Sequence, residues 1–246
     1  MRRTMLAPLV LALPIAVLPF VAAGPAVADG AANANLSPVV SNGSTGSGTA
    51  MVKVTGNTID FTLAASELAD GPHAAHIHFG AEARHECPTE ADDADADARL
   101  STTEGGPAYG PIVVSLTRSG DTSAESGLAV DRFAAGTSIQ YMRGGVTVEP
   151  GVATAIESGQ AVVVVHGVAY EGEKASVKSD LDPALPASAT DPAICGVLEA
   201  APAGGAATGL GGAAPSSTTA LLGLGGAALV AGAGAAAVAA RRVREQ

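Results

Sequence analysis

Residues 73–87 read HAAHIHFGAEARHEC and hold four of the five histidines and one of the two cysteines of this 246-residue chain. If Ala74–Phe79 forms a strand, its twofold period places the side chains of His76 and His78 on one face, roughly 7 Å apart. Two neutral imidazoles presented in this way can share one transition-metal ion. The alternative is a pair of solvated strand histidines that bind no metal.

Apolar runs on both sides of this stretch predict further short strands. Two of them, within Met51–Ser66, are separated by the hairpin signal Gly56-Asn57. The run Ala161–Val168 (AVVVVHGV) is apolar on both faces and predicts a central strand. Trp is absent and aromatic residues are scarce, so a core of Val, Ile, Leu and Ala is expected, and we predict an all-β protein. The remaining expected strands are Pro111–Thr117, Ser138–Val148 with a break at Gly144-Gly145, and Ile194–Leu198.

The two ends of the chain have the composition of targeting segments. Residues 1–28 predict a secretory signal peptide, with a basic start, an apolar run and a small-residue cleavage site. Residues 201–217 predict a flexible linker, 218–240 a transmembrane anchor, and 241–246 a basic cytoplasmic tail. We therefore expect a domain that is exported and anchored to the cell membrane from outside. A helix that inserts poorly or is removed by processing, and attachment to a cell wall, are the alternatives.

Between these ends we expect a flexible segment at residues 29–49, rich in Asn, Ser and Gly, and one β domain at residues 50–200. The chain carries a net charge of −11, and acidic residues dominate the predicted domain. An acidic exported domain has no electrostatic reason to bind nucleic acid or anionic lipid. Cys87 and Cys195 should pair in the oxidising environment outside the cell, with a free reactive thiol as the alternative.

An acidic segment follows Cys87 and has the spacing of a calcium loop. Asp93, Asp95, Asp97, Ser101 and Glu104 fall at positions 1, 3, 5, 9 and 12 of an EF-hand-type loop, and Arg99 offers its carbonyl at position 7. Ala98 occupies the position where the pattern has Gly, which should weaken the loop. No helical pair clearly flanks it. The alternative is a solvated Asp/Ala repeat.

The order of these motifs resembles Cu/Zn superoxide dismutase. That family has a His-x-x-His-x-His strand, a disulfide cysteine nine residues later, a Val-Val-His strand and a closing Cys-Gly-Val-Ile. They match His73-Ala-Ala-His76-Ile-His78, Cys87, Val-Val-His166 and Cys195-Gly-Val-Leu. The resemblance implies a Greek-key β-barrel or sandwich, with His76, His78 and His166 as ligands of copper and His73 as a structural histidine beside them. The segment GPHAAHIHFG is also similar to the CHRD domain.

Three departures limit what the dismutase resemblance implies. No histidine lies between Cys87 and His166, so the metal-bridging histidine and the zinc site of that family have no counterpart. Pro192 stands where the family has an arginine that attracts superoxide. On its own, a histidine such as His166 at the end of an aliphatic strand is more often a rim residue than a ligand.

Three hypotheses follow from these patterns. The first is a surface-anchored, dismutase-like domain that binds one copper or zinc ion, with weak superoxide or redox activity or a copper-holding role. The second is a CHRD-like extracellular binding module for a protein or glycan partner, without enzymatic activity. The third is a surface protein whose metal chemistry is confined to calcium at residues 93–104.

Overall fold

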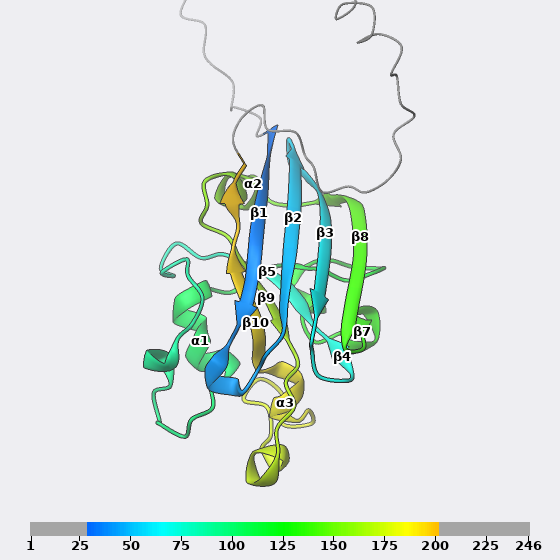
Figure 1. Cartoon of the computed structure of the whole chain (residues 1–246). Coiled ribbons are helices and arrows are strands. Elements are labelled where there is room, and N and C mark those ends of the chain that lie inside the picture. The colour runs from blue at the N-terminus through cyan, green and yellow to red at the C-terminus, as the bar shows by residue number, and fades with distance from the viewer. Residues whose placement is uncertain (1–28, 202–246) are drawn as a thin grey trace, which may run out of the picture. The chain divides into compact units, whose positions relative to one another are not determined.

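Strands dominate residues 29–201, the part of the chain that the computed structural model describes (Figure 1). The strands are β1 (Asp29–Pro38), β2 (Ser47–Thr55), β3 (Thr58–Ser66), β4 (Pro72–His73), β5 (Ala75–His78), β6 (Ile112–Ser115), β7 (Ala134–Ala135), β8 (Ser138–Thr147), β9 (Val162–His166), β10 (Pro192–Val197) and β11 (Glu199–Ala200). The helices are short: α1 (Thr102–Tyr109), α2 (Pro150–Glu157) and α3 (Ala187–Thr190), with 3-10 turns η1 (Val40–Asn42), η2 (Glu90–Asp92), η3 (Ala124–Ser126), η4 (Val130–Arg132) and η5 (Gly172–Ser176). The prediction of an all-β protein is confirmed.

The expected signal peptide, anchor, tail and nearly all of the linker lie outside the described residues. Within residues 29–201, no helix is both long and apolar enough to span a bilayer.

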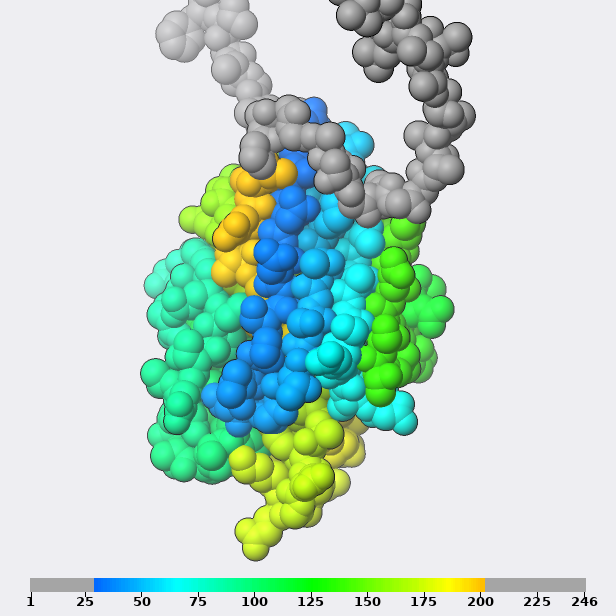
Figure 2. Space-filling view, in the orientation of Figure 1, coloured from blue at the N-terminus to red at the C-terminus, as the bar shows by residue number. Residues whose placement is uncertain are grey.

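The main sheet is a curled antiparallel half-barrel in the order β6-β5-β9-β10-β1-β2-β3-β8, with β11 paired to one end of β1 (Figure 1). β4 and β7 form a separate pair. The expected hairpin is present, because β2 and β3 pair in full and only Gly56 and Asn57 lie between them. Gly56 has φ +60°, a conformation that glycine adopts without strain. Figure 2 shows the outward surface of β1, β2 and β3 side by side.

The prediction that residues 29–49 are flexible is wrong. Asp29–Pro38 is the strand β1, which pairs with β2 on one side and with β10 and β11 on the other. Its buried side chains are Ala32, Ala34 and Leu36, which alternate with exposed polar residues. Small alanines on the inner face give a weak hydrophobic signal, so the pattern looks like a polar linker although it is a central strand.

The closed barrel that the dismutase resemblance implies is not formed by backbone pairing among the described residues, since the sheet ends at β6 and β8. Side chains join these two edges instead. The Tyr141 hydroxyl donates to the carbonyl of Leu116 at 2.6 Å, and the Arg143 guanidinium donates to Thr117. β6 is only four residues long, and β8 carries an irregularity in its register near Gly144, where a break was expected. A strand of four residues offers few backbone groups for pairing, and a bulge disrupts the ladder locally.

β9 is central, as its continuous apolar run predicts. It pairs with β5 and β10, and all five of its residues are buried. Val163 and Val165 face the main core inside the half-barrel, whereas Val162 and Val164 pack with Leu100 and other residues of a smaller cluster on the opposite face. The sheet is therefore covered on both faces along β9.

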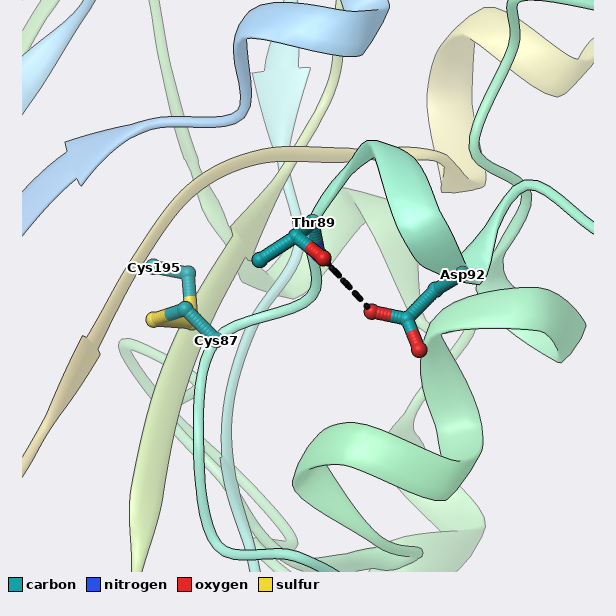
Figure 3. The surroundings of a disulfide bond; sticks show 4 residues. All are labelled: Cys87, Thr89, Asp92 and Cys195. Atoms are coloured by element: carbon teal, nitrogen blue, oxygen red, sulfur yellow. Dashed lines mark hydrogen bonds between the residues drawn. A yellow bond between two sulfur atoms is a disulfide. The ribbon is translucent and has the colours of Figure 1, made fainter.

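Cys87 and Cys195 form a disulfide bond, as predicted. Cys195 lies in the middle of β10 and is buried, and Cys87 starts the segment that leads to η2 (Figure 3). In that segment the N–H of Thr89 donates to the Asp92 carboxylate at 2.8 Å, and this hydrogen bond is part of the cap at the start of η2. The disulfide bond therefore ties the acidic segment that follows Cys87 to strand β10 of the sheet.

Removal of the disulfide should lower stability strongly. We expect the double variant Cys87→Ser, Cys195→Ser to lose about 3 to 5 kcal/mol of unfolding free energy, because the bond closes a long loop in the unfolded chain. Urea unfolding of both proteins, with and without reducing agent, measures the effect. The reductant should lower the wild type to the level of the variant and leave the variant unchanged. A loss below about 1 kcal/mol would contradict the role of the bond.

Candidate metal centre

The alternation of β5 and β9 brings three histidines to one face of the sheet. In β5, Ala75 and Ile77 face the main core, so His76 and His78 face the opposite side. In β9, His166 follows Val162 and Val164 on that same side. His76 pairs with Val164 across the two strands, which makes His166 its diagonal neighbour.

The three imidazoles, called here the histidine cluster, converge closely. The ring centroids of His76 and His166 are 5.1 Å apart, those of His76 and His78 are 5.6 Å apart, and those of His78 and His166 are 6.1 Å apart. One nitrogen of each ring lies within 4.8 Å of the corresponding nitrogens of the other two. The prediction that these distant residues converge on a small volume is confirmed.

The other nitrogen of each ring is fixed by a backbone carbonyl. His76 Nε2 bonds to Gly127 at 3.0 Å, His78 Nδ1 to Gly110 at 2.8 Å, and His166 Nδ1 to Thr190. Because a carbonyl can only accept, each of these nitrogens must carry the proton. The lone pairs are then on His76 Nδ1, His78 Nε2 and His166 Nε2, all buried and without a hydrogen-bond partner.

Burial keeps all three rings neutral. It lowers the pKa of His78 to about 3 and that of His166 to about 4, and the neighbouring imidazole of His166 adds to the effect for His78. Burial, followed by the charges of the other two rings, also lowers the pKa of His76. Neutral imidazoles with free lone pairs are the form that binds a metal ion.

His73 lies beside the cluster rather than in it. Its Nδ1 is 2.9 Å from the carbonyl oxygen of His166, and its Nε2 is 2.9 Å from that of Ala69. Gly167 has φ +105°, and a Cβ there would lie 2.6 Å from Nδ1 of His73. Glycine is therefore required for the ring of His73 to approach the backbone that carries His166.

Three segments, which include α1, η3 and α3, cover the histidine cluster, and we call residues 102–110, 124–130 and 181–190 the covering layer. They contribute the carbonyls of Gly110, Gly127 and Thr190 that hold the three rings. Together with the cluster they enclose a pocket of about 240 Å³ that reaches the three rings. Sequence reasoning missed these acceptors, because a backbone carbonyl has no residue type that would mark it.

The acidic loop, residues 93–104, brings three of the expected carboxylates together. Carboxylate oxygens of Asp93, Asp95 and Glu104 lie within 4.8 Å of one another. Ala98 has φ +61°, at the position where the pattern has glycine, and its N–H donates to Asp93 at 2.9 Å. Asp97 is not part of this group, and its carboxylate accepts from the N–H of Arg99 at 2.7 Å.

The last residues of the acidic loop begin the helix α1, which the sequence did not predict. Ser101 and Glu104 form a reciprocal cap at the start of α1, with Ser101 N–H donating to the Glu104 carboxylate. Ser101 is thus occupied as a helix cap. Gly105, Gly106 and Pro107 disfavour helices and obscured this one. α1 ends at Tyr109 and is capped by Gly110, the residue whose carbonyl holds His78.

Polar contacts that the sequence did not reveal connect the acidic loop to the sheet. The side chain of Asn42 donates to the carbonyls of Leu100 and Pro192, both at 2.9 Å, and accepts from Leu100 N–H. The side chain of Arg99 pairs with buried Asp191 at 2.9 Å. Burial raises the pKa of Asp191 to about 6 in spite of this partner. Arg99 therefore serves an ion pair as well as offering its carbonyl in the loop.

These features define an all-β domain with a buried cluster of three histidines on the outer face of its sheet. The family model of the CHRD domain matches residues 25–174, more than half of the chain and a range that includes His76, His78 and His166. The chain belongs to the CHRD domain family. No curated protein matches it. The CHRD resemblance is thus confirmed, whereas the resemblance to superoxide dismutase stays a prediction.

The lowered histidine pKa values predict acid sensitivity of the metal-free domain. Below about pH 6.5 the unfolded chain takes up protons that the buried rings exclude, so stability should fall as pH drops from 6.5 towards 4. Each ring contributes up to about 1.4 kcal/mol per pH unit. His78→Gln should show a shallower dependence than the wild type in urea unfolding across this range. His85→Gln, outside the cluster, should keep the full slope, and equal slopes in all three proteins would contradict the prediction.

Proposed function

We propose that this domain holds one copper or zinc ion through His76 Nδ1, His78 Nε2 and His166 Nε2. The observation that carries the proposal is the set of three buried lone pairs without partners, each on a ring whose other nitrogen is tied to a carbonyl. Leaving a buried acceptor unpaired costs about 1 to 3 kcal/mol, so three at one point need a compensating ligand. The carbonyl contacts also fix ring orientation, as they do in known metal sites.

The donor set favours copper or zinc over calcium or magnesium. Imidazole nitrogens suit both transition metals, and three of them leave a position open for a further ligand. Bound copper would supply one-electron redox chemistry, and bound zinc would act as a Lewis acid. His73 would support His166 from behind through its contact with the backbone. The acidic surroundings argue that any reaction with superoxide is weak, because no basic side chain lines the described pocket.

We also propose that the domain works outside the cell, anchored to the membrane by residues 218–240. The disulfide between Cys87 and Cys195 supports export, because such bonds persist in oxidising compartments. The amino-terminal composition of a signal peptide and the basic residues after the apolar run point the same way.

A second candidate function is a non-enzymatic extracellular binding module for a protein or glycan. Membership of the CHRD domain family favours it. In that case the histidine cluster would have a structural role only. Metal content separates the two candidates, because a purely structural cluster requires no copper or zinc.

A calcium ion in the acidic loop is a further part of the proposal. Supporting it are the grouping of Asp93, Asp95 and Glu104 and the positive φ of Ala98. Their carboxylates are the hard oxygen ligands that calcium prefers. The engagement of Asp97 with Arg99 removes one expected ligand, so the affinity should be modest.

Copper loading tests the histidine site. We expect about one copper per chain after dialysis and an EPR signal of tetragonal Cu(II) with nitrogen ligands. His166→Gln should lower the affinity by about 100-fold or more, because it removes a ligand from a preorganised set. His85→Gln is the matched control and should bind as the wild type does. Equal copper content and spectra in all three proteins, or no bound copper or zinc in the wild type, would refute the site.

Calcium should raise the melting temperature of the wild type, since an ion that binds the folded state at 100 times its Kd adds about 2.7 kcal/mol. Asp95→Asn should reduce this rise while keeping the oxygen that accepts from Asp97 N–H. Asp182→Asn changes a similar acceptor elsewhere, which bonds to Ala184 N–H, and should leave the rise intact. Calorimetry with calcium and with magnesium measures the shifts in melting temperature. A calcium-induced rise in Asp95→Asn as large as that of the wild type would exclude a site at this loop.

A further inference from the structure

The pocket over the histidine cluster is wide and mostly apolar. Its volume of about 240 Å³ far exceeds the roughly 30 Å³ of one water molecule, so a group the size of a side chain fits beside the three rings. Aliphatic side chains from three parts of the chain form its walls: Ile112, Leu128, Val130, Leu181 and Leu185. A ligand at the open side of the cluster would therefore touch hydrocarbon over most of its surface.

The charges around this pocket are negative. Glu125 is the one ionisable side chain besides the histidines among the described residues that line it, and none of them is Lys or Arg. Asp180 adds negative potential at His166, and its carboxylate accepts from Thr103 N–H at the start of α1. A small anion entering the pocket meets the negative charge of Glu125 and no cationic side chain in the lining, which opposes its attraction to the proposed metal ion.

The mouth of the pocket displays exposed hydrocarbon. Leu128 is 38% exposed and Leu181 is 46% exposed, and both belong to the few large apolar side chains exposed in residues 29–201. Exposed apolar side chains around a polar centre are typical of binding sites. The mouth thus extends the apolar walls outwards.

We infer that the open side of the histidine cluster takes an uncharged nitrogen donor carried on an apolar body, such as an alkylated imidazole, and that it disfavours small anions. The inference rests on the proposed metal site, because the donor would be the further ligand of the ion. Neutral charge avoids repulsion by Glu125 and Asp180. An alkyl-bearing ring gains from contact with Leu128, Val130 and Leu185, and the volume admits it.

A graded ligand series tests the apolar contact. The Cu(II)-loaded protein is titrated with imidazole, 4-methylimidazole and 4-ethylimidazole, followed by EPR and visible absorption. Each added carbon should tighten binding by about fourfold, because each buried CH₂ contributes about 0.8 kcal/mol. Cu(II) held by diethylenetriamine, which has no walls, is the reference and should show a nearly flat series. A flat series in the protein would overturn the inference.

Two pairs of variants assign the effect to the pocket. Leu128→Ala should flatten the alkyl series, whereas Met142→Ala, which truncates another exposed apolar side chain on β8, should not. Glu125→Gln should raise the affinity for azide about two- to fivefold and leave that for 4-ethylimidazole unchanged. Glu149→Gln, an exposed acidic residue outside the pocket lining, should change neither. Azide binding more tightly to the wild type than 4-ethylimidazole does would also overturn the inference.

A further titration distinguishes a donor on a partner protein from a free small molecule. N-acetylhistidine methylamide carries the ring on a peptide backbone. Binding as tight as that of 4-methylimidazole would indicate the histidine of a partner protein, and much weaker binding would indicate a free heterocycle, and either result sustains a neutral nitrogen donor. Failure of the metal site is seen separately, because the nitrogen-ligated copper signal would be absent before any ligand is added.

Discussion

The hydrogen bonds between three buried imidazoles and three backbone carbonyls hold this domain's outer layer in place. Gly110, Gly127 and Thr190 belong to separate segments of the covering layer, and each accepts from a different histidine. The rings stand on two adjacent strands whose other faces are locked into the main core. The sheet thus presents donors in fixed positions, and the loops fold against them. The same bonds leave the remaining nitrogens facing one another, so packing and the proposed metal site share one cause.

A second set of contacts connects the acidic loop to the same layer. Asn42 bridges Leu100 and Pro192, Arg99 pairs with Asp191, and the hydroxyl of Thr102 donates to the Thr190 carbonyl. That carbonyl also accepts from His166. The acidic loop therefore leads into α1, and through Thr102 it also contacts α3. Ordering of the loop and ordering of the cluster should be coupled, because both depend on Thr190 and α1.

Sequence patterns predicted the strands with strong apolar alternation, the disulfide and the convergence of the histidines. These depend on side-chain types and on spacing, which a sequence displays directly. They failed for β1, whose inner face is mostly alanine, and for α1, whose Gly105-Gly106-Pro107 disfavours a helix. They also failed for barrel closure, because a four-residue strand and a bulge become apparent only when strands are paired. The carbonyl acceptors and most of the pocket walls come from loops and very short helices, which are too short to give a periodic signal.

The placement of the disulfide has a consequence for how the cluster assembles. His76 and His78 precede Cys87 by a short stretch, whereas His166 lies inside the loop that the bond closes. Through the sulfur atoms the covalent path from His78 to His166 is much shorter than the path along the chain. In an oxidised but unfolded chain, the effective concentration of the third imidazole around the first two is therefore raised. An oxidised nascent chain is in this way predisposed to gather its ligands before the sheet has formed.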